Sequence, residues 1–141
     1  MSYTSDEEIE AIGRAVLART LPKAEWAHNA HFAAAVWMIA RHGASALREM
    51  RAAIFAYNEA TGTPNTDTSG YHETITIASL ALAEAHIRAH PGAPMFAQVN
   101  GLLAGPCGQS GWILAYWSRE RLFTVEARRG WVPPDLQPLP A

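Results

Sequence analysis

Residues 26–40 read WAHNAHFAAAVWMIA, a stretch in which apolar side chains would occupy every side of an α-helix. A helix that lacks a polar face is normally buried among other elements. Proline fits well in a first helical turn, and glycine commonly follows a helix end. We therefore expect a helix from about Pro22 or Lys23 to Arg41, stopped by Gly43, as the central helix of a bundle.

Further helices are expected on both sides of this stretch. Ser5 and Glu8 form a capping-box pattern, which predicts a first helix that reaches about Thr20. Downstream, helices are expected over about residues 44–60, 71–89, 94–104, 110–117, 119–123 and 125–129. No convincing alternating run of β-branched residues occurs, so the predicted fold is all-α: a single-domain helical bundle over residues 1–141.

Two segments do not read as helix. Residues 61–70, TGTPNTDTSG, are dense in turn-forming residues and predict the longest loop. Residues 131–141 contain four prolines, which predicts an extended tail packed on the surface.

Composition narrows the class of protein. The chain has 141 residues, of which 49% are hydrophobic and 17% charged, enough for one domain with a substantial core. The formal charge of -2 gives no basic field for nucleic acid or an anionic membrane, so neither is expected as a partner. Cys107 is the only cysteine, which excludes an intramolecular disulfide.

The location is expected to be cytoplasmic. The acidic, polar start of the chain lacks the basic and apolar regions of a secretory signal. The apolar run from Ala33 to Ala40 is far shorter than the roughly 20 residues of a transmembrane helix. The abundance of alanine, together with Lys23 as the only lysine, suggests a bacterial source with a GC-rich genome.

Two histidine motifs are the candidate functional residues. His28 and His31 lie three apart, so they face nearly the same side of a helix and could chelate one metal ion. His72 could supply the third ligand that a zinc site needs. Glu73 could act as a general base toward a metal-bound water, or it could orient a ligand. A metalloprotease is excluded, because no second histidine follows Glu73 at the required spacing.

The same residues also have a structural interpretation. Buried histidines and asparagines usually hydrogen-bond to helix ends and neighbouring side chains, and a His-x-x-His pair is by itself a weak metal signal. Asn58 could reach the same site or could cap the preceding helix, while Arg51 is expected to point outward into solvent. The tryptophans and tyrosines could line a pocket beside the histidines or could simply fill the core.

The chain resembles a family of small bacterial proteins that carry Trp-x-His-x-x-His, Tyr-His-Glu-Thr-Ile-Thr and Pro-Pro-Asp-Leu motifs. Here these motifs are Trp26–His31, Tyr71–Thr76 and Pro133–Leu136. The resemblance implies that the two histidine motifs belong to one module. No activity is attached to that family, so the resemblance implies no mechanism.

Two functions remain open from the sequence. The leading hypothesis is a site formed by His28, His31, His72 and Glu73 that binds a divalent metal, zinc above all, or a small ligand, with metal-dependent hydrolysis as its reaction. The alternative is a non-catalytic binding or interaction protein, in which these residues form a hydrogen-bond network. A small-molecule ligand and a homo-oligomer are compatible with both.

Overall fold

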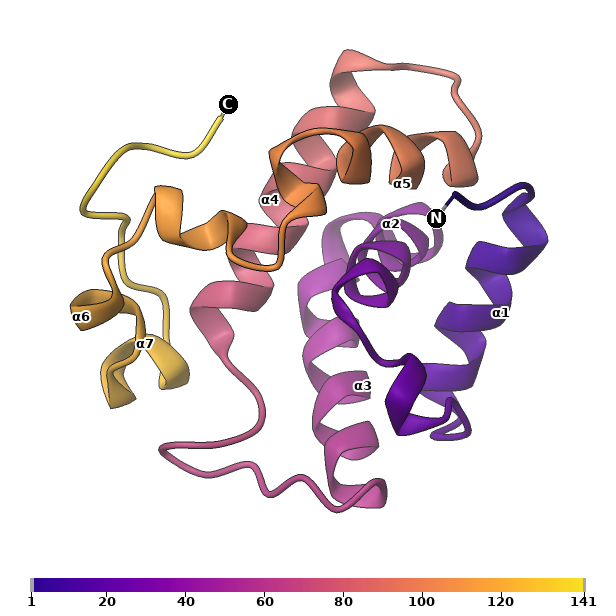
Figure 1. Cartoon of the computed structure of the whole chain (residues 1–141). Coiled ribbons are helices and arrows are strands. Elements are labelled where there is room, and N and C mark those ends of the chain that lie inside the picture. Colours follow the sequence, from indigo (N-terminus) through magenta and orange to yellow (C-terminus); the bar gives the residue numbers. More distant parts are fainter. Residues whose placement is uncertain (1, 141) are drawn as a thin grey trace.

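The computed structural model describes residues 2–140, and over this range its regular secondary structure consists of helices joined by loops, without a strand (Figure 1). The α-helices are α1 (Asp6–Leu17), α2 (His28–His42), α3 (Ala46–Ala60), α4 (Glu73–Ala89), α5 (Met95–Ala104), α6 (Arg119–Leu122) and α7 (Val125–Arg129). Short 3-10 helices are η1 (Lys23–Glu25), η2 (Gly43–Ser45), η3 (Pro106–Gly108) and η4 (Trp112–Ala115). The predicted all-α, bundle-like fold is confirmed.

Helix α2 lies at the centre of the bundle. It packs against α1, α3, α4 and α5, which surround it in Figure 1. Residues 32–38 of α2 are buried without a break, as the absence of a polar face predicts. Small side chains let the neighbouring helices approach closely. Where α1 crosses α2, Gly13 lies directly against the Trp37 ring.

The start of α2 differs from the prediction. A separate 3-10 turn, η1, follows Pro22, and α2 begins only at His28. Trp26 and Ala27 leave the helical region between them, with ψ angles of 63° and 178°. The Trp26 ring packs on His31 and Tyr57, which ties this break to the body of the bundle. His28 therefore lies in the first turn of a helix rather than in its interior.

Other boundaries also shift. Helix α1 ends at Leu17, before the predicted Thr20, and Arg19 adopts a positive φ of 64°. Helix α4 begins at Glu73 because His72 acts as its N-cap. The predicted helix over residues 110–117 is reduced to the 3-10 turn η4, which directly follows Gly111.

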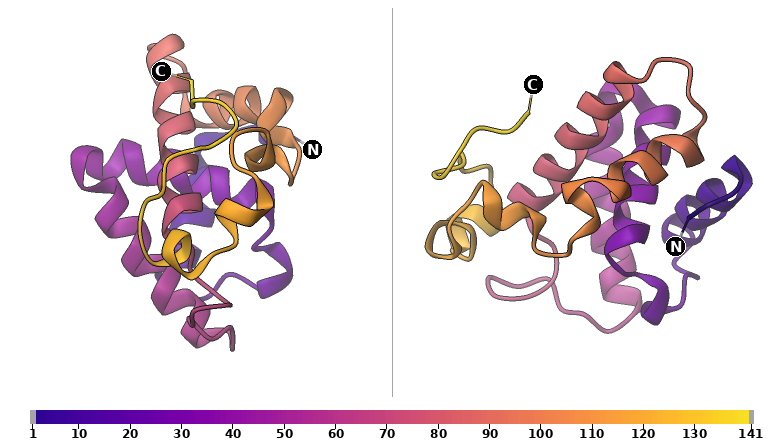
Figure 2. Two further views of the ribbon diagram at one scale, coloured as in Figure 1. Left: turned by 90° about the vertical axis from the view of Figure 1, so that its left-hand side faces the viewer. Right: turned by 45° about the horizontal axis from the view of Figure 1, so that its top comes forward.

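The C-terminal segment, residues 117–140, covers the beginning of α4. Figure 2 shows the yellow part of this segment running across the N-terminal half of α4. The Thr74 hydroxyl donates to the Gly130 carbonyl at 2.8 Å and accepts the Val132 N–H at 3.2 Å. The Trp117 indole donates to the Val132 carbonyl at 3.0 Å. In residues 2–140, no helix combines the length and apolar character needed to cross a membrane.

Candidate functional site

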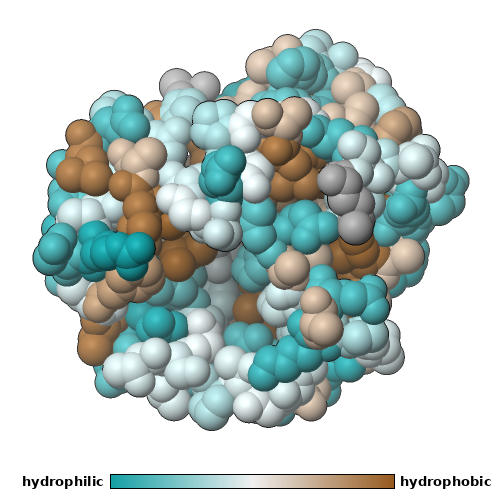
Figure 3. All heavy atoms as spheres, viewed as in Figure 1, coloured by the Kyte–Doolittle hydropathy of each residue, from teal (hydrophilic) through white to brown (hydrophobic). Residues whose placement is uncertain are grey.

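A pocket of about 300 Å³ opens beside the first turn of α2. Its walls come from Trp26, which directly follows η1, from α2 and α3, from the loop over residues 61–72 and from the first turns of α4. The lining residues are Trp26, His31, Ile54, Asn58, Thr63, Gly70, Tyr71, His72, Ile75 and Thr76. We call this the His31 pocket. Figure 3 shows the corresponding face hollowed near its centre, with hydrophobic surface at the floor of the hollow.

The loop closes one side of this pocket. Asn65 organises it, because its Oδ1 accepts the Asn58 amide at 3.1 Å and the Tyr71 backbone N–H at 3.0 Å. Gly70 has a φ of 80°, and a Cβ there would lie 2.5 Å from the Pro64 carbonyl oxygen. Only glycine therefore fits this close approach. The turn-rich composition of residues 61–70 thus places Gly70 and Tyr71 at the wall of the pocket.

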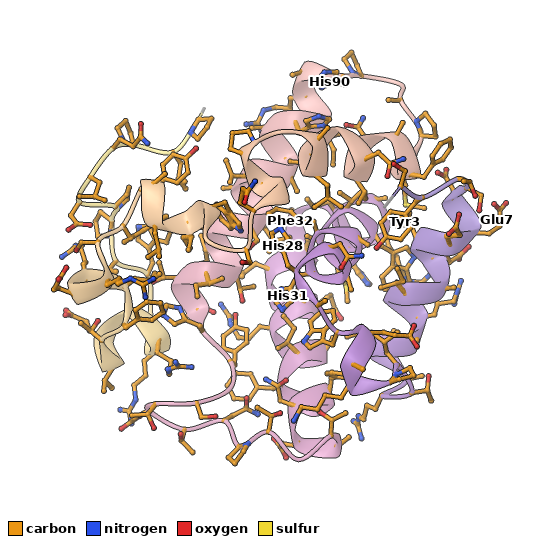
Figure 4. All side chains as sticks on the ribbon, in the orientation of Figure 1. Tyr3, Glu7, His28, His31, Phe32 and His90 are labelled. Carbon is orange, nitrogen blue, oxygen red and sulfur yellow. The ribbon has the colours of Figure 1, made fainter. Side chains whose placement is uncertain are left out.

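His31 is the polar centre of the pocket. The Trp26 ring lies over its imidazole with the two centroids 4.2 Å apart, and Figure 4 shows His31 on the side of α2 that faces α3. Burial, helped by the nearby His28, lowers the pKa of His31 to about 4, so the ring is uncharged at neutral pH.

The ring nitrogens of His31 are available to a ligand. Neither nitrogen has a hydrogen-bond partner among residues 2–140. No fully buried side-chain nitrogen or oxygen of the described residues lacks a partner, so neither of these two nitrogens is completely buried, and His31 lines the pocket. The Oδ1 atom of Asn58 is also free to accept a hydrogen bond. The Asn58 amide nitrogen donates to Asn65, while Oδ1 accepts no hydrogen bond from the described residues.

His28 turns away from His31. Its Nε2 hydrogen-bonds to the carbonyl oxygen of Cys107, and its ring meets Phe32 edge-on at 5.5 Å. It does not line the His31 pocket. His28 therefore ties α2 to η3, where the buried Cys107 thiol has a pKa raised by burial.

His72 lines the pocket but has both ring nitrogens engaged. Its Nδ1 accepts the Ile75 N–H at 3.2 Å, and its Nε2 lies 2.8 Å from the Leu122 carbonyl oxygen. This pattern requires a neutral ring with the proton on Nε2. Burial lowers the pKa of His72, and so does the nearby positive charge of Arg128. Both effects favour the neutral ring.

Glu73 is held by an ion pair rather than left free as a base. Its carboxylate accepts from Arg51 Nε at 3.0 Å and from Arg51 Nη2 at 2.5 Å, and the Tyr71 hydroxyl donates to it at 2.5 Å. Burial raises the pKa of Glu73, but the hydrogen bonds from Arg51 and Tyr71 outweigh that effect, and the net pKa is lowered. The Arg51 side chain is 40% exposed, as its expected outward position implies, but it also pairs with Glu73, which the loop returns to its side.

Glu73 and Arg51 line a second pocket on the other side of Tyr71. This pocket measures about 400 Å³, and its lining residues are Arg51, Phe55, Asn65, Thr66, Asp67, Tyr71, Glu73, Arg128 and Arg129. We call it the arginine pocket. No local pattern in the sequence predicts this pocket, because its residues come from α3, the loop, the start of α4 and α7.

The structure thus brings together part of the predicted site. His31 and His72 share one pocket, as expected of two helix starts that approach each other, and Asn58 joins them. His28 and Glu73 lie elsewhere. Within residues 2–140, no three histidine, cysteine or acidic side chains are placed so as to hold a metal ion. The zinc site built from His28, His31 and His72 stays a prediction.

Comparisons of the chain with protein-family models, with curated proteins and with solved structures found no match.

Proposed function

We propose that the protein binds a small, uncharged molecule in the His31 pocket. The proposal depends above all on the imidazole of His31, which is neutral, accessible and without a protein hydrogen-bond partner among the described residues. A buried polar group normally has a hydrogen-bond partner, either in the protein or in ordered water. A ligand that bonds to this ring would supply the partner that the described residues do not.

The polar groups favour a ligand with a hydroxyl or N–H group. A neutral imidazole offers one donor and one acceptor, and Asn58 Oδ1 adds a second acceptor. Since the pKa of His31 is about 4, the ring carries no charge at neutral pH that would attract an anion. A hydroxyl or amide group on the ligand would match this arrangement.

The rest of the pocket favours a flat or compact apolar body. Trp26, Ile54 and Ile75 supply apolar walls. A volume of about 300 Å³ is at the small end of the range for ligand pockets, so the ligand would be smaller than a typical drug molecule.

Metal-dependent hydrolysis receives less support than ligand binding. Glu73 would have to leave Arg51 and Tyr71 to act as a base, and its lowered pKa makes it a weak one. A metal bound by His28 and His72 would have to displace their hydrogen bonds to the Cys107 and Leu122 carbonyls. For Glu73, His28 and His72, the observed contacts favour the alternative interpretation, a structural hydrogen-bond network.

Phenol and toluene form a matched pair of probes, because they share a ring and differ in one hydroxyl. We expect phenol to bind more tightly than toluene by roughly three- to tenfold, as one net hydrogen bond of about 0.5–1.5 kcal/mol implies. In His31→Phe, which keeps an aromatic ring against Trp26, this preference should be reduced, because only Asn58 Oδ1 remains to accept the phenol hydroxyl. Titration calorimetry at pH 7 measures both affinities.

His42→Phe is the matched control, since His42 is on the same helix and lines neither the His31 pocket nor the arginine pocket. It should leave the phenol preference intact. Equal affinities for the two probes in the wild-type protein would contradict the proposal, as would a phenol preference in His31→Phe as large as that of the wild type.

A further inference from the structure

The arginine pocket contains one positive charge that the protein does not balance. Arg51 pairs with Glu73, and Arg129 Nη2 lies 2.5 Å from Asp67. Arg128, by contrast, forms no salt bridge with a carboxylate of residues 2–140. The lining of the pocket therefore carries a net charge of about one positive unit near neutral pH.

Arg128 is fixed in place rather than free to move into solvent. Its Nη1 donates to the Gly70 carbonyl at 2.9 Å and to the Tyr71 carbonyl at 3.3 Å. The side chain is half-buried, so part of its hydration is lost. A guanidinium has five N–H donors, and the remaining ones are available to a ligand. A half-buried cation whose hydrogen-bond partners are all uncharged is stabilised when an anion pairs with it.

An apolar wall stands next to this charge. The Phe55 and Tyr71 rings lie 4.8 Å apart, and 38% of Phe55 is exposed. The Tyr71 hydroxyl is already donated to Glu73, so Tyr71 contributes its ring and not its hydroxyl. The pocket thus combines one unbalanced guanidinium with an aromatic surface.

We propose that the arginine pocket is a second binding site, for a small carboxylic acid with an aromatic body. The carboxylate would bind to Arg128, and the single negative charge would balance the pocket. The aromatic body would pack against Phe55. A doubly charged phosphate would exceed the available charge and would leave Phe55 without a partner. This site is separate from the His31 pocket and does not depend on what binds there.

Benzoate is the probe, with benzyl alcohol as its uncharged counterpart and inorganic phosphate as the purely anionic one. Titration calorimetry at low salt and pH 7 should show saturable benzoate binding, at least about tenfold tighter than benzyl alcohol or phosphate, since a charge-assisted hydrogen bond contributes at this scale. Arg128→Gln should weaken benzoate binding by about tenfold or more. Arg88→Gln, on the exposed C-terminal part of α4, should change it less than twofold.

The site can also be located without a variant. In nitrogen-15 spectra of the wild-type protein, benzoate should move the Nε–H signal of Arg128 and leave that of Arg88 in place. His31→Phe should bind benzoate as the wild type does, which separates this site from the proposed function. Absence of saturable binding, tighter binding of phosphate than of benzoate, or an Arg128 signal that stays in place would each overturn the proposal.

Discussion

The Nε2 atom of His72 lies 2.8 Å from the carbonyl oxygen of Leu122, 50 residues later in the chain. The opposite ring nitrogen caps α4 by accepting the Ile75 N–H. One imidazole therefore begins a helix and fixes the C-terminal segment against it. The same ring forms part of the wall of the His31 pocket.

His72→Ala should destabilise the protein by about 2–3 kcal/mol. It removes a helix cap and a buried hydrogen bond, and it leaves the Leu122 carbonyl without its partner. The asparagine of His72→Asn can keep the cap through its side-chain oxygen but is too short to reach Leu122. This variant should therefore lose about half as much unfolding free energy as His72→Ala. Urea unfolding measures both. A loss below about 0.5 kcal/mol in His72→Ala would contradict the dual role.

The Arg51–Glu73 pair should show measurable coupling in a double-mutant cycle of Arg51→Met and Glu73→Gln. The contact is bidentate and the Glu73 side chain is only 12% exposed, but Arg51 is 40% exposed, so we expect about 1 kcal/mol of coupling. The same cycle at Arg48 and Glu49, an exposed pair at 3.8 Å, should give about zero. Equal coupling in the two pairs would show that Glu73 is held no more firmly than a surface carboxylate.

The uncharged state of His31 predicts a loss of stability in acid. Its pKa in the folded protein is about 4, below the unfolded value of 6.5, so the unfolded chain takes up the proton first as pH falls. The contribution of His31 is therefore complete above pH 6.5 and declines as pH falls toward 4. Because the ring is partly accessible, we expect a loss of about 1–2 kcal/mol between pH 7.5 and pH 5.

Other groups also titrate in this range, so the comparison needs a variant. The difference in unfolding free energy between the wild type and His31→Phe, measured in urea at both pH values, isolates the contribution of His31. Between pH 7.5 and pH 5, the wild type should lose more unfolding free energy than His31→Phe. A pH-independent difference would mean that the pKa of His31 is not lowered in the folded protein.

Gly13→Ala tests the contact between α1 and α2. An added Cβ would lie 2.3 Å from two atoms of the buried Trp37 ring, so the helices would have to separate. We expect a net loss of about 1–3 kcal/mol, because overpacking outweighs the better helix propensity of alanine. Gly111→Ala, where no atom lies within 4 Å of the new Cβ, should change the unfolding free energy by less than about 0.5 kcal/mol. Similar losses in the two variants would contradict the close packing at Gly13.

The sequence predicted the central position of α2 correctly because burial follows from side-chain composition on all sides of a helix. It also predicted the loop over residues 61–70 and the approach of His31 to His72. Those features depend on local patterns that a single chain displays directly.

The division of roles among the histidines could not be predicted in this way. Their spacing predicts that His28 and His31 lie on nearly the same side of a helix, but the partner of His28 is a backbone carbonyl 79 residues away. The ion pair of Arg51 was also not predictable, because its partner Glu73 lies 22 residues away and is brought to its side only by the loop. Histidine is an uncommon helix cap, so the beginning of α4 at Glu73 had no usual signal in the sequence.

Ligand binding at His31 is tested most directly by a long-range proton–nitrogen spectrum of the histidine rings, recorded at pH 7 with increasing phenol. The signals of the two His31 ring nitrogens should shift and saturate, while those of His86 and His90, at the far end of α4, should stay in place. Unchanged His31 nitrogens at saturating phenol, or equal shifts in all three rings, would contradict ligand binding at His31.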